Sequence, residues 1–157
     1  MTIIVCVSQN WGIGQDGQTL FRLSADRRRF RELTMGKTLI LGPRNLATFP
    51  GGKPLPGRRH VLLTRSETYV EGTETAHSPE EAAALAGPDA LVVGGASVYT
   101  RMLPLCDRVL VTKVEAAPEA DSYFPNLDKH PDWRLASESE TMEENGLRFR
   151  FAEYVRA

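Results

Sequence analysis

The sequence predicts an α/β protein built on a mixed, mainly parallel and twisted sheet, with helices on both faces and antiparallel strands at its C-terminal end. Three observations predict this fold class. Short apolar runs recur along residues 3–112, as in strands buried on both faces. Segments with helix start signals lie between these runs, and residues 133–151 show the alternation and turn signal of antiparallel strands.

The expected elements follow in chain order. The core strands are residues 3–7, 38–41, 60–63, 90–93 and 109–112. Helices are expected at residues 24–35 with Ser24 as N-cap, from Pro43 for a short stretch, at 78–86 and at 96–103. Asn145-Gly146 is expected to join strand 133–137 to the alternating Leu147, Phe149 and Phe151. In such sheets ligands bind at the carboxyl ends of the strands.

Length and composition indicate one compact domain over residues 1–157, long enough to bury about two thirds of its unfolded surface. A net charge of −1 gives no reason to expect nucleic acid or a membrane surface as partner. Cys6 and Cys106 have no ligand spacing, so we expect neither a metal nor a disulfide. The N-terminal apolar run is too short for a signal peptide or membrane span, which predicts a cytoplasmic protein.

Asp26 is the most informative single residue, because it places a carboxylate on the inward face of the helix expected at 24–35. Phe30 and Leu33 follow it on the same face. Taken alone, Asp26 is better explained by the helix dipole, which favours acidic residues in the first turn. The alternative is a carboxylate held for a ligand. The opposite face of the helix is expected to carry Arg27, Arg28, Arg29, Arg31 and Glu32.

The segment Gly12-Ile13-Gly14-Gln15-Asp16-Gly17 matches the dinucleotide fingerprint G-x-G-x-x-G in its letters only. That fingerprint must lie between a strand and a helix, and residues 18–23 carry no helix start signal. A mobile loop of about a dozen residues that covers a ligand site is the better interpretation, with a plain surface loop as the alternative.

Two strand-to-helix junctions contain glycine, at Leu41-Gly42-Pro43 and at Val93-Gly94-Gly95-Ala96. Backbone N–H groups at such helix starts bind anions such as pyrophosphate, although glycine also simply makes tight turns. A third segment, Lys53-Pro54-Leu55-Pro56-Gly57-Arg58-Arg59, is fixed by its prolines. It presents Arg58 rigidly, which suits bidentate binding of a carboxylate. The alternative is that this arginine is only a solvent-exposed charge on a loop.

Together these residues resemble the dihydrofolate reductase family from end to end. The resemblance implies an eight-stranded mixed sheet, NADPH as hydride donor, and reduction of 7,8-dihydrofolate to 5,6,7,8-tetrahydrofolate. We expect a monomer that also binds antifolate inhibitors. The motifs that carry the resemblance are, in order, Trp11-Gly12-Ile13-Gly14, Leu23-Ser24-Ala25-Asp26, Phe30, Pro54-Leu55-Pro56-Gly57-Arg58, Val93-Gly94-Gly95-Ala96-Ser97-Val98-Tyr99, Val111-Thr112 and Asp121-Ser122-Tyr123-Phe124-Pro125.

The resemblance implies a catalytic group of Asp26, Thr112 and Phe21. Asp26 would bind the pterin 2-amino group and N3, and Thr112 would orient its carboxylate. Hydride would pass from nicotinamide C4 to pterin C6, and water would protonate N5 because Asp26 lies too far away. Arg58 would bind the glutamate α-carboxylate. The other substrate-binding residues would be Ile4, Val5, Cys6, Phe30, Phe49, Leu55, Val93 and Tyr99.

The same resemblance places the nicotinamide beside Cys6 and Tyr99, the pyrophosphate at the two glycine helix starts, and the adenosine phosphate near Arg44 and Arg65. It implies no metal. The cofactor-binding residues would be Cys6, Ile13, Gly14, Gly42, Pro43, Arg44, Asn45, Thr64, Arg65, Gly94, Gly95, Ala96, Ser97, Val98 and Tyr99.

The chain departs from the family pattern at three places, and the mildest is Ser24 in place of the family's second proline, because serine suits a helix cap. Leu20-Phe21 stands where the family has Pro-Trp, and Phe21 cannot donate the indole hydrogen bond, so proton delivery and antifolate affinity are in question. Gly42-Pro43-Arg44-Asn45 replaces the usual Gly-Arg-x-Thr, which moves the arginine by one place and removes a backbone donor. The preference for NADPH over NADH is therefore also in question. Pro43 suits the first position of a helix.

Two other functions remain open. A riboflavin-pathway reductase of the same fold would act on a pyrimidine ribosyl phosphate, but it gives no reason for Asp26 together with the segment 54–58. A non-catalytic nucleotide- or antifolate-binding protein is suggested by Phe21 and Pro43. The presence of Asp26, Thr112 and Arg58 argues against it.

Overall fold

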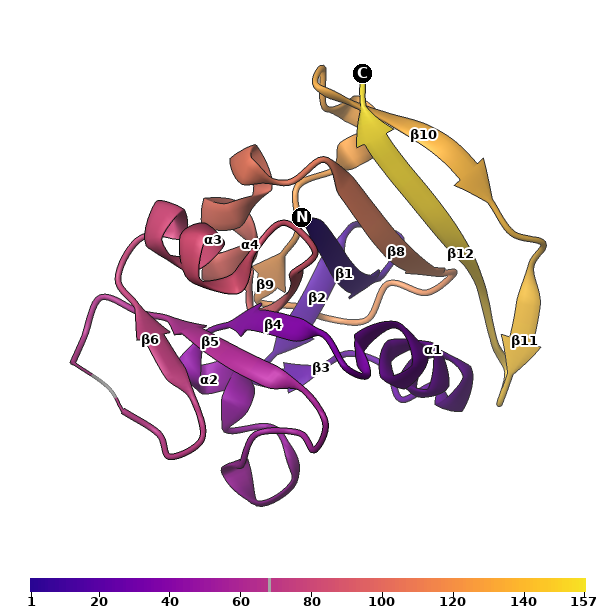
Figure 1. Ribbon diagram of the computed structural model, residues 1–157. Coiled ribbons are helices and arrows are strands. Elements are labelled where there is room, and N and C mark those ends of the chain that lie inside the picture. The colour runs from indigo at the N-terminus through magenta and orange to yellow at the C-terminus, as the bar shows by residue number, and fades with distance from the viewer. Residues whose placement is uncertain (68) are drawn as a thin grey trace.

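A mixed, twisted sheet forms the centre of the computed structural model, which describes residues 1–67 and 69–157 (Figure 1). From β8 to β6 every neighbouring pair is parallel, whereas β12 pairs antiparallel with β8, β10 and β11 (Met142–Glu144). This arrangement confirms the predicted fold class. In sheet order the strands are β10 (Trp133–Glu138), β12 (Leu147–Arg156), β8 (Arg108–Val114), β1 (Thr2–Val7), β7 (Leu91–Gly94), β4 (Thr38–Leu41), β5 (Arg59–Leu63) and β6 (Glu74–Ala76).

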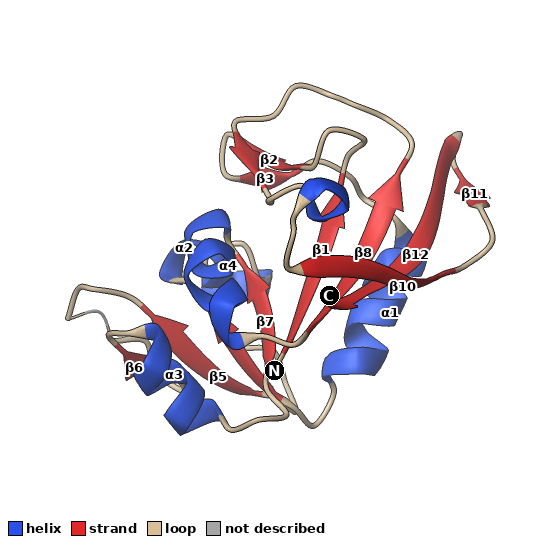
Figure 2. Cartoon of the chain, turned by 90° about the horizontal axis from the view of Figure 1, so that it is seen from above, coloured by secondary structure: helices blue, strands red, loops and turns tan. Residues whose placement is uncertain are grey.

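Helices cover both faces of the sheet (Figure 2). Successive residues of β4 show this, because Leu39 packs in one cluster with Phe30 and Leu46, whereas Ile40 packs in another with Ala82 and Val98. None of the helices in the described residues is long and apolar enough to cross a membrane. The helices are α1 (Ser24–Thr34), α2 (Pro43–Leu46), α3 (Pro79–Ala86) and α4 (Ala96–Met102), with short 3-10 turns at Pro50–Gly52, Leu103–Leu105 and Leu127–Lys129.

The five predicted core strands are all present, with ends within two residues of those expected. The C-terminal turn differs from the prediction. Asn145 and Gly146 have φ of 51° and 80°, as a two-residue hairpin turn requires, but they join β12 to β11 and not to the strand that starts at Trp133. That strand, β10, pairs with the second half of β12. One long strand thus has two short antiparallel partners on the same side.

The glycine-rich segment predicted as a loop over a ligand site does line the cleft, but it is not irregular: it forms a hairpin of β2 (Gly12–Gln15) and β3 (Gln18–Thr19). Asp16 and Gly17 turn the chain with φ of 51° and 75°, the conformation of a type I′ turn. A third strand, β9 (Ser122–Tyr123), pairs with β2, and Asp121 Oδ2 accepts a hydrogen bond from Asp16 N at 2.9 Å. The hairpin lies beyond the carboxyl end of β1 (Figure 2).

The N-terminus of α1 is capped from a distant strand. The predicted cap by Ser24 is wrong, because Ser24 is already the first helical residue and the N-cap, Leu23, makes no side-chain cap bond. Glu144 of β11 takes this role: its carboxylate oxygens accept from Ser24 N at 2.7 Å and from Ala25 N at 3.1 Å. These charge-assisted bonds hold the pKa of Glu144 below its ordinary value. The hairpin of β11 and β12 therefore fixes the start of α1.

Arg29 does not lie on the outward face of α1 as expected. Its guanidinium carbon stands 4.1 Å from the centre of the Phe151 ring, so the helix packs on β12 through a cation–π contact. Burial lowers the pKa of Arg29, while the charge of Asp26, one turn away, raises it. Arg27, Arg28, Arg31 and Glu32 are exposed, as predicted.

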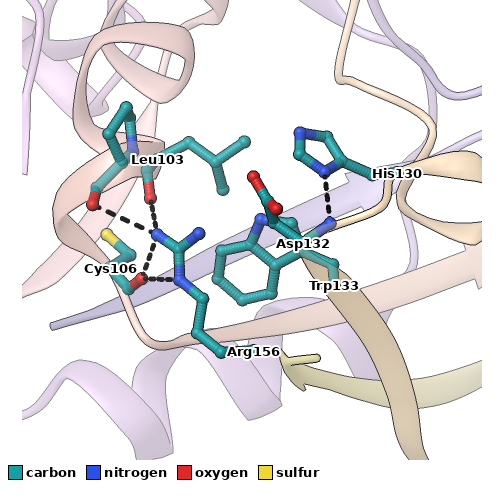
Figure 3. Close-up of a pocket in the computed structure, with 7 residues that line it drawn as sticks. Leu103, Cys106, His130, Asp132, Trp133 and Arg156 are labelled. Atoms are coloured by element: carbon teal, nitrogen blue, oxygen red, sulfur yellow. Dashed lines mark hydrogen bonds between the residues drawn. The ribbon is translucent and has the colours of Figure 1, made fainter.

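A small cavity of about 300 Å³ lies where the last strand meets the end of α4 (Figure 3). Arg156 Nη2 donates to the carbonyl oxygens of Leu103, Pro104 and Cys106 at 2.8, 3.1 and 2.7 Å. Its guanidinium carbon also stands 4.3 Å from the centre of the Trp133 ring. The guanidinium is thus directed at the chain itself and ties β12 to the 3-10 turn after α4.

Candidate active site

A cleft of about 1510 Å³ opens at the carboxyl ends of the parallel strands, bounded by the β2–β3 hairpin, α1 and the first turns of α2 and α4. Of the residues expected at the site, Thr112 alone does not line this cleft. Thr112 lies behind Asp26 and reaches the cleft only through that carboxylate.

 Every other residue expected at the site, 24 in all, lines the cleft itself.

Asp26 projects from the first turn of α1 towards β8, where Thr112 Oγ1 donates a hydrogen bond to Asp26 Oδ1 at 2.6 Å. Burial raises the pKa of Asp26, while the Thr112 hydroxyl and the positive charge of Arg29 act in the opposite direction. The carboxylate is therefore oriented by one protein donor and poorly solvated. It is suited to bind N–H groups of a ligand, which would replace the lost water.

Tyr99 joins the neighbouring central strands β1 and β7 inside the cleft. Its buried hydroxyl lies 2.7 Å from the Ile4 carbonyl oxygen and 3.0 Å from that of Val93, and burial raises its pKa so that it remains a donor. Asn45 Nδ2 also donates to the Val93 oxygen, at 3.1 Å. Asn45, expected to bind the cofactor, thus directs its amide at β7 and holds α2 against that strand.

Arg58 lies at the edge of the cleft between the segment 54–58 and the end of α1. Its Nε donates to the Pro56 carbonyl oxygen at 3.0 Å, and its Nη1 donates to Thr34 Oγ1 at 3.2 Å. These contacts use two of the five guanidinium N–H groups, which leaves others for a carboxylate. Beside it the apolar wall of the cleft is formed by Phe30, Phe49 and Leu55.

The two glycine junctions lie next to each other at the other half of the cleft. Gly42 and Gly95 are the N-caps of α2 and α4, and Pro43 occupies the first helical position, as predicted. A Cβ at residue 42 would stand 3.2 Å from Val98 Cγ2, whereas a Cβ at residue 95 would meet no atom within 4 Å. At Gly95 the backbone is therefore open to the cleft, which fits the close approach of a pyrophosphate.

Phe21 packs against a cluster of Leu23, Val114 and Phe149 and also lines the cleft. Its ring carries no hydrogen-bond donor, so any water at this position must be held by other groups. The side chain has an apolar packing role that the sequence did not predict.

Two polar residues near the site were not predicted. Glu144 caps the helix that carries Asp26 from about 120 positions away, and no local signal in the sequence indicates this contact. His60 is fully buried beneath the segment that presents Arg58. A histidine at the start of an apolar run was the available signal for it.

An oriented carboxylate in one half of a cleft and glycine helix starts in the other half define a nucleotide-dependent reductase built on an α/β sheet. The dihydrofolate reductase family model matches residues 1–156. By this match the chain belongs to the dihydrofolate reductase family, whose members are NADPH-dependent oxidoreductases.

Individual relatives agree with this assignment. Dihydrofolate reductase of Mycobacterium tuberculosis is 37% identical over 150 residues, which cover 92% of this chain and 91% of that protein. The enzyme of Neisseria meningitidis serogroup B is 33% identical over 160 residues, or 99% of this chain and 98% of that protein. Dihydrofolate reductase from Enterococcus faecalis, solved in complex with NADP(H) and RAB-propyl, superposes with a TM-score of 0.86 at 28% identity, covering 99% of this chain and 95% of that one.

Proposed function

We propose that this protein reduces 7,8-dihydrofolate to 5,6,7,8-tetrahydrofolate with NADPH. The observation that carries the proposal is the hydrogen-bonded pair of Thr112 and Asp26, which supplies an oriented carboxylate inside a cleft that also contains two glycine helix starts. A pterin has adjacent N–H groups that a single carboxylate can bind in a bidentate manner.

In this proposal Asp26 accepts hydrogen bonds from the pterin 2-amino group and N3, and Thr112 keeps the carboxylate in the plane of the ring. The aminobenzoyl ring lies against the wall formed by Phe30, Phe49 and Leu55. The glutamate α-carboxylate takes the free N–H groups of Arg58. Binding the substrate at both ends fixes the reacting carbon between them.

When bound, NADPH supplies a hydride from nicotinamide C4 to pterin C6. The backbone N–H groups at the starts of α2 and α4 would hold its pyrophosphate, and the basic side chains of Arg44 and Arg65 would hold the adenosine phosphate. Cys6, Ile13, Gly14 and Tyr99 would surround the nicotinamide.

Asp26 contributes to protonation of N5 through its charge. An ionised carboxylate in a poorly solvated cleft stabilises positive charge that develops on the pterin, so N5 becomes easier to protonate from water. Phe21 lines the same part of the cleft without offering a hydrogen bond, so backbone groups or the substrate must orient that water.

The direct test is whether the purified protein oxidises NADPH when dihydrofolate is present. The reaction is monitored as the loss of NADPH absorbance. We expect turnover that depends on both compounds and that is slower with NADH. A pyrimidine ribosyl phosphate, the substrate class of the riboflavin-pathway reductases, should give no turnover. A folded protein that binds NADPH and dihydrofolate without turnover would contradict the catalytic proposal and favour a binding protein.

We also propose that the protein acts as a cytoplasmic monomer and binds antifolates in the dihydrofolate half of the cleft. The residues proposed to hold the substrate and the cofactor all come from this one chain, which supports this proposal. Cys6 and Cys106 are both free thiols, which suits a reducing compartment. Analytical ultracentrifugation of the purified protein measures the oligomeric state directly.

A further inference from the structure

The imidazole of His60 lies beneath the segment that presents Leu55 and Arg58 and contacts both of its ends. His60 is the second residue of β5 and is 0% exposed. Its Nε2 lies 3.1 Å from the Leu55 backbone nitrogen, and its Nδ1 lies 3.1 Å from the Arg58 carbonyl oxygen. One ring therefore bridges both ends of the four-residue segment 55–58.

The two partners determine which nitrogen carries the proton. A carbonyl oxygen only accepts, so Nδ1 must donate to Arg58 O, and a backbone N–H only donates, so Nε2 must accept from Leu55 N. The ring is thus neutral in this arrangement. Burial lowers the pKa of His60 and outweighs the hydrogen bond to the Arg58 carbonyl oxygen, which raises it; the Arg58 charge also lowers it, and the net direction agrees with a neutral ring.

Contacts on other sides fix the ring and the segment relative to α1. Phe49 packs edge-on against His60 with ring centres 6.1 Å apart. The Gly57 carbonyl oxygen accepts from Gly36 N at 2.9 Å, and a Cβ at residue 57 would stand 2.7 Å from Met35 Sδ. The segment therefore packs closely against the end of α1. The His60 ring, hydrogen-bonded to both ends of the segment, fixes the distance between Leu55 and Arg58.

We infer that His60 is a positioning residue for the benzoylglutamate half of the substrate, acting through Leu55 and Arg58. The inference rests on the proposed function, in which Leu55 walls the aminobenzoyl ring and Arg58 binds the α-carboxylate. Both ends of that half of the substrate depend on one buried ring. In the proposed binding mode the pterin and the cofactor are held by other residues, so His60 would control recognition of the substrate tail alone.

Three variants separate the two hydrogen bonds. His60→Leu removes both. His60→Gln places an amide oxygen near the position of Nε2 and keeps an acceptor for Leu55 N, whereas His60→Asn places an amide nitrogen near Nδ1 and keeps a donor for Arg58 O. Each variant is compared with the wild type for binding of dihydrofolate, by calorimetry, and for turnover of dihydrofolate and of a dihydropterin that lacks the benzoylglutamate tail.

We expect His60→Leu to weaken dihydrofolate binding and to raise its KM about tenfold or more, because it leaves two buried backbone groups without their hydrogen-bond partner. His60→Gln and His60→Asn should each recover part of this loss. NADPH affinity and turnover of the tail-less dihydropterin should stay within about twofold of the wild type. Thermal melting shows which variants are folded, and if His60→Leu does not fold, the Gln and Asn variants carry the test.

Equal losses with dihydrofolate and with the dihydropterin would overturn the inference, because His60 would then act through the whole fold. Unchanged dihydrofolate binding in all folded variants would also overturn it. A different outcome would contradict the proposed function: the wild-type protein would bind dihydrofolate in the calorimeter but would not oxidise NADPH. The calorimetric comparison of the variants still decides the role of His60 in that case, and a wild type that does not bind dihydrofolate contradicts both.

Discussion

Replacing Thr112 by valine isolates the hydrogen bond that orients the proposed catalytic carboxylate. Valine keeps the shape of threonine but removes the hydroxyl that donates to Asp26 Oδ1 at 2.6 Å. A hydrogen bond to a charged group contributes about 1.5–3 kcal/mol, and 1.36 kcal/mol corresponds to a factor of ten. The ionised form of Asp26 should therefore lose roughly ten- to a hundredfold in its equilibrium with the protonated form.

The sign follows from the two effects on Asp26. Burial raises its pKa and the Thr112 hydroxyl lowers it, so removal of the hydroxyl raises the pKa further. The assay is the pH profile of kcat/KM for dihydrofolate, which reports ionisations of the free enzyme and substrate. In Thr112→Val the ionisation of Asp26 should move towards neutral pH.

Thr112→Ser is the matched control, because serine keeps the hydroxyl and removes only a methyl group. Its profile should lie close to that of the wild type. An unchanged profile in folded Thr112→Val, or an equal shift in both variants, would show that the Thr112 hydroxyl does not control Asp26.

Three other predictions concern charged residues. Asp26→Asn should reduce turnover more at neutral than at acid pH, where the substrate arrives already protonated. It should also raise the melting temperature at neutral pH but not at low pH, because burial raises the pKa of Asp26; the stability cost of its ionisation sets in above the ordinary pKa of the group and is complete above the raised one. Arg58→Leu should weaken dihydrofolate binding roughly ten- to a hundredfold in calorimetry with little change for NADPH, and Arg44→Leu should do the reverse. Glu144→Ala should lower the melting temperature at neutral pH, with a smaller difference in acid. The pKa of Glu144 is lowered in the folded protein, so its carboxylate contributes stability above its ordinary pKa, and this stability is lost as the pH falls through the lowered pKa. Equal melting curves for the variant and the wild type would contradict this.

The features that could be predicted from the sequence are those that depend on residues close together along the chain. The central strands were recognisable because both faces of β1, β4 and β7 are covered, which leaves uninterrupted apolar runs. The position of Asp26 followed from the spacing of Phe30 on the same helix. The resemblance to the family then named the residues that the fold gathers around one cleft.

Contacts between distant segments were not predictable in this way. Ser24 looked like a cap, but Glu144 satisfies the first N–H groups of α1 from the other end of the chain. Arg29 followed the polar periodicity of α1 and yet packs on Phe151, a contact set by the position of β12. For the hairpin at residues 12–19 a local signal did exist, the Asp16-Gly17 turn, but the glycine spacing favoured a loop.

The cap of α1 by Glu144 has a consequence for the order in which the protein can mature on the ribosome. The helix that carries Asp26 is made early, whereas its hydrogen-bond partner Thr112 and its cap Glu144 are made much later. A nascent chain that lacks β8 therefore has the Asp26 carboxylate without a fixed direction, and one that lacks β11 has the helix without its cap. Synthesis has to reach the last hairpin before the first helix acquires its final place.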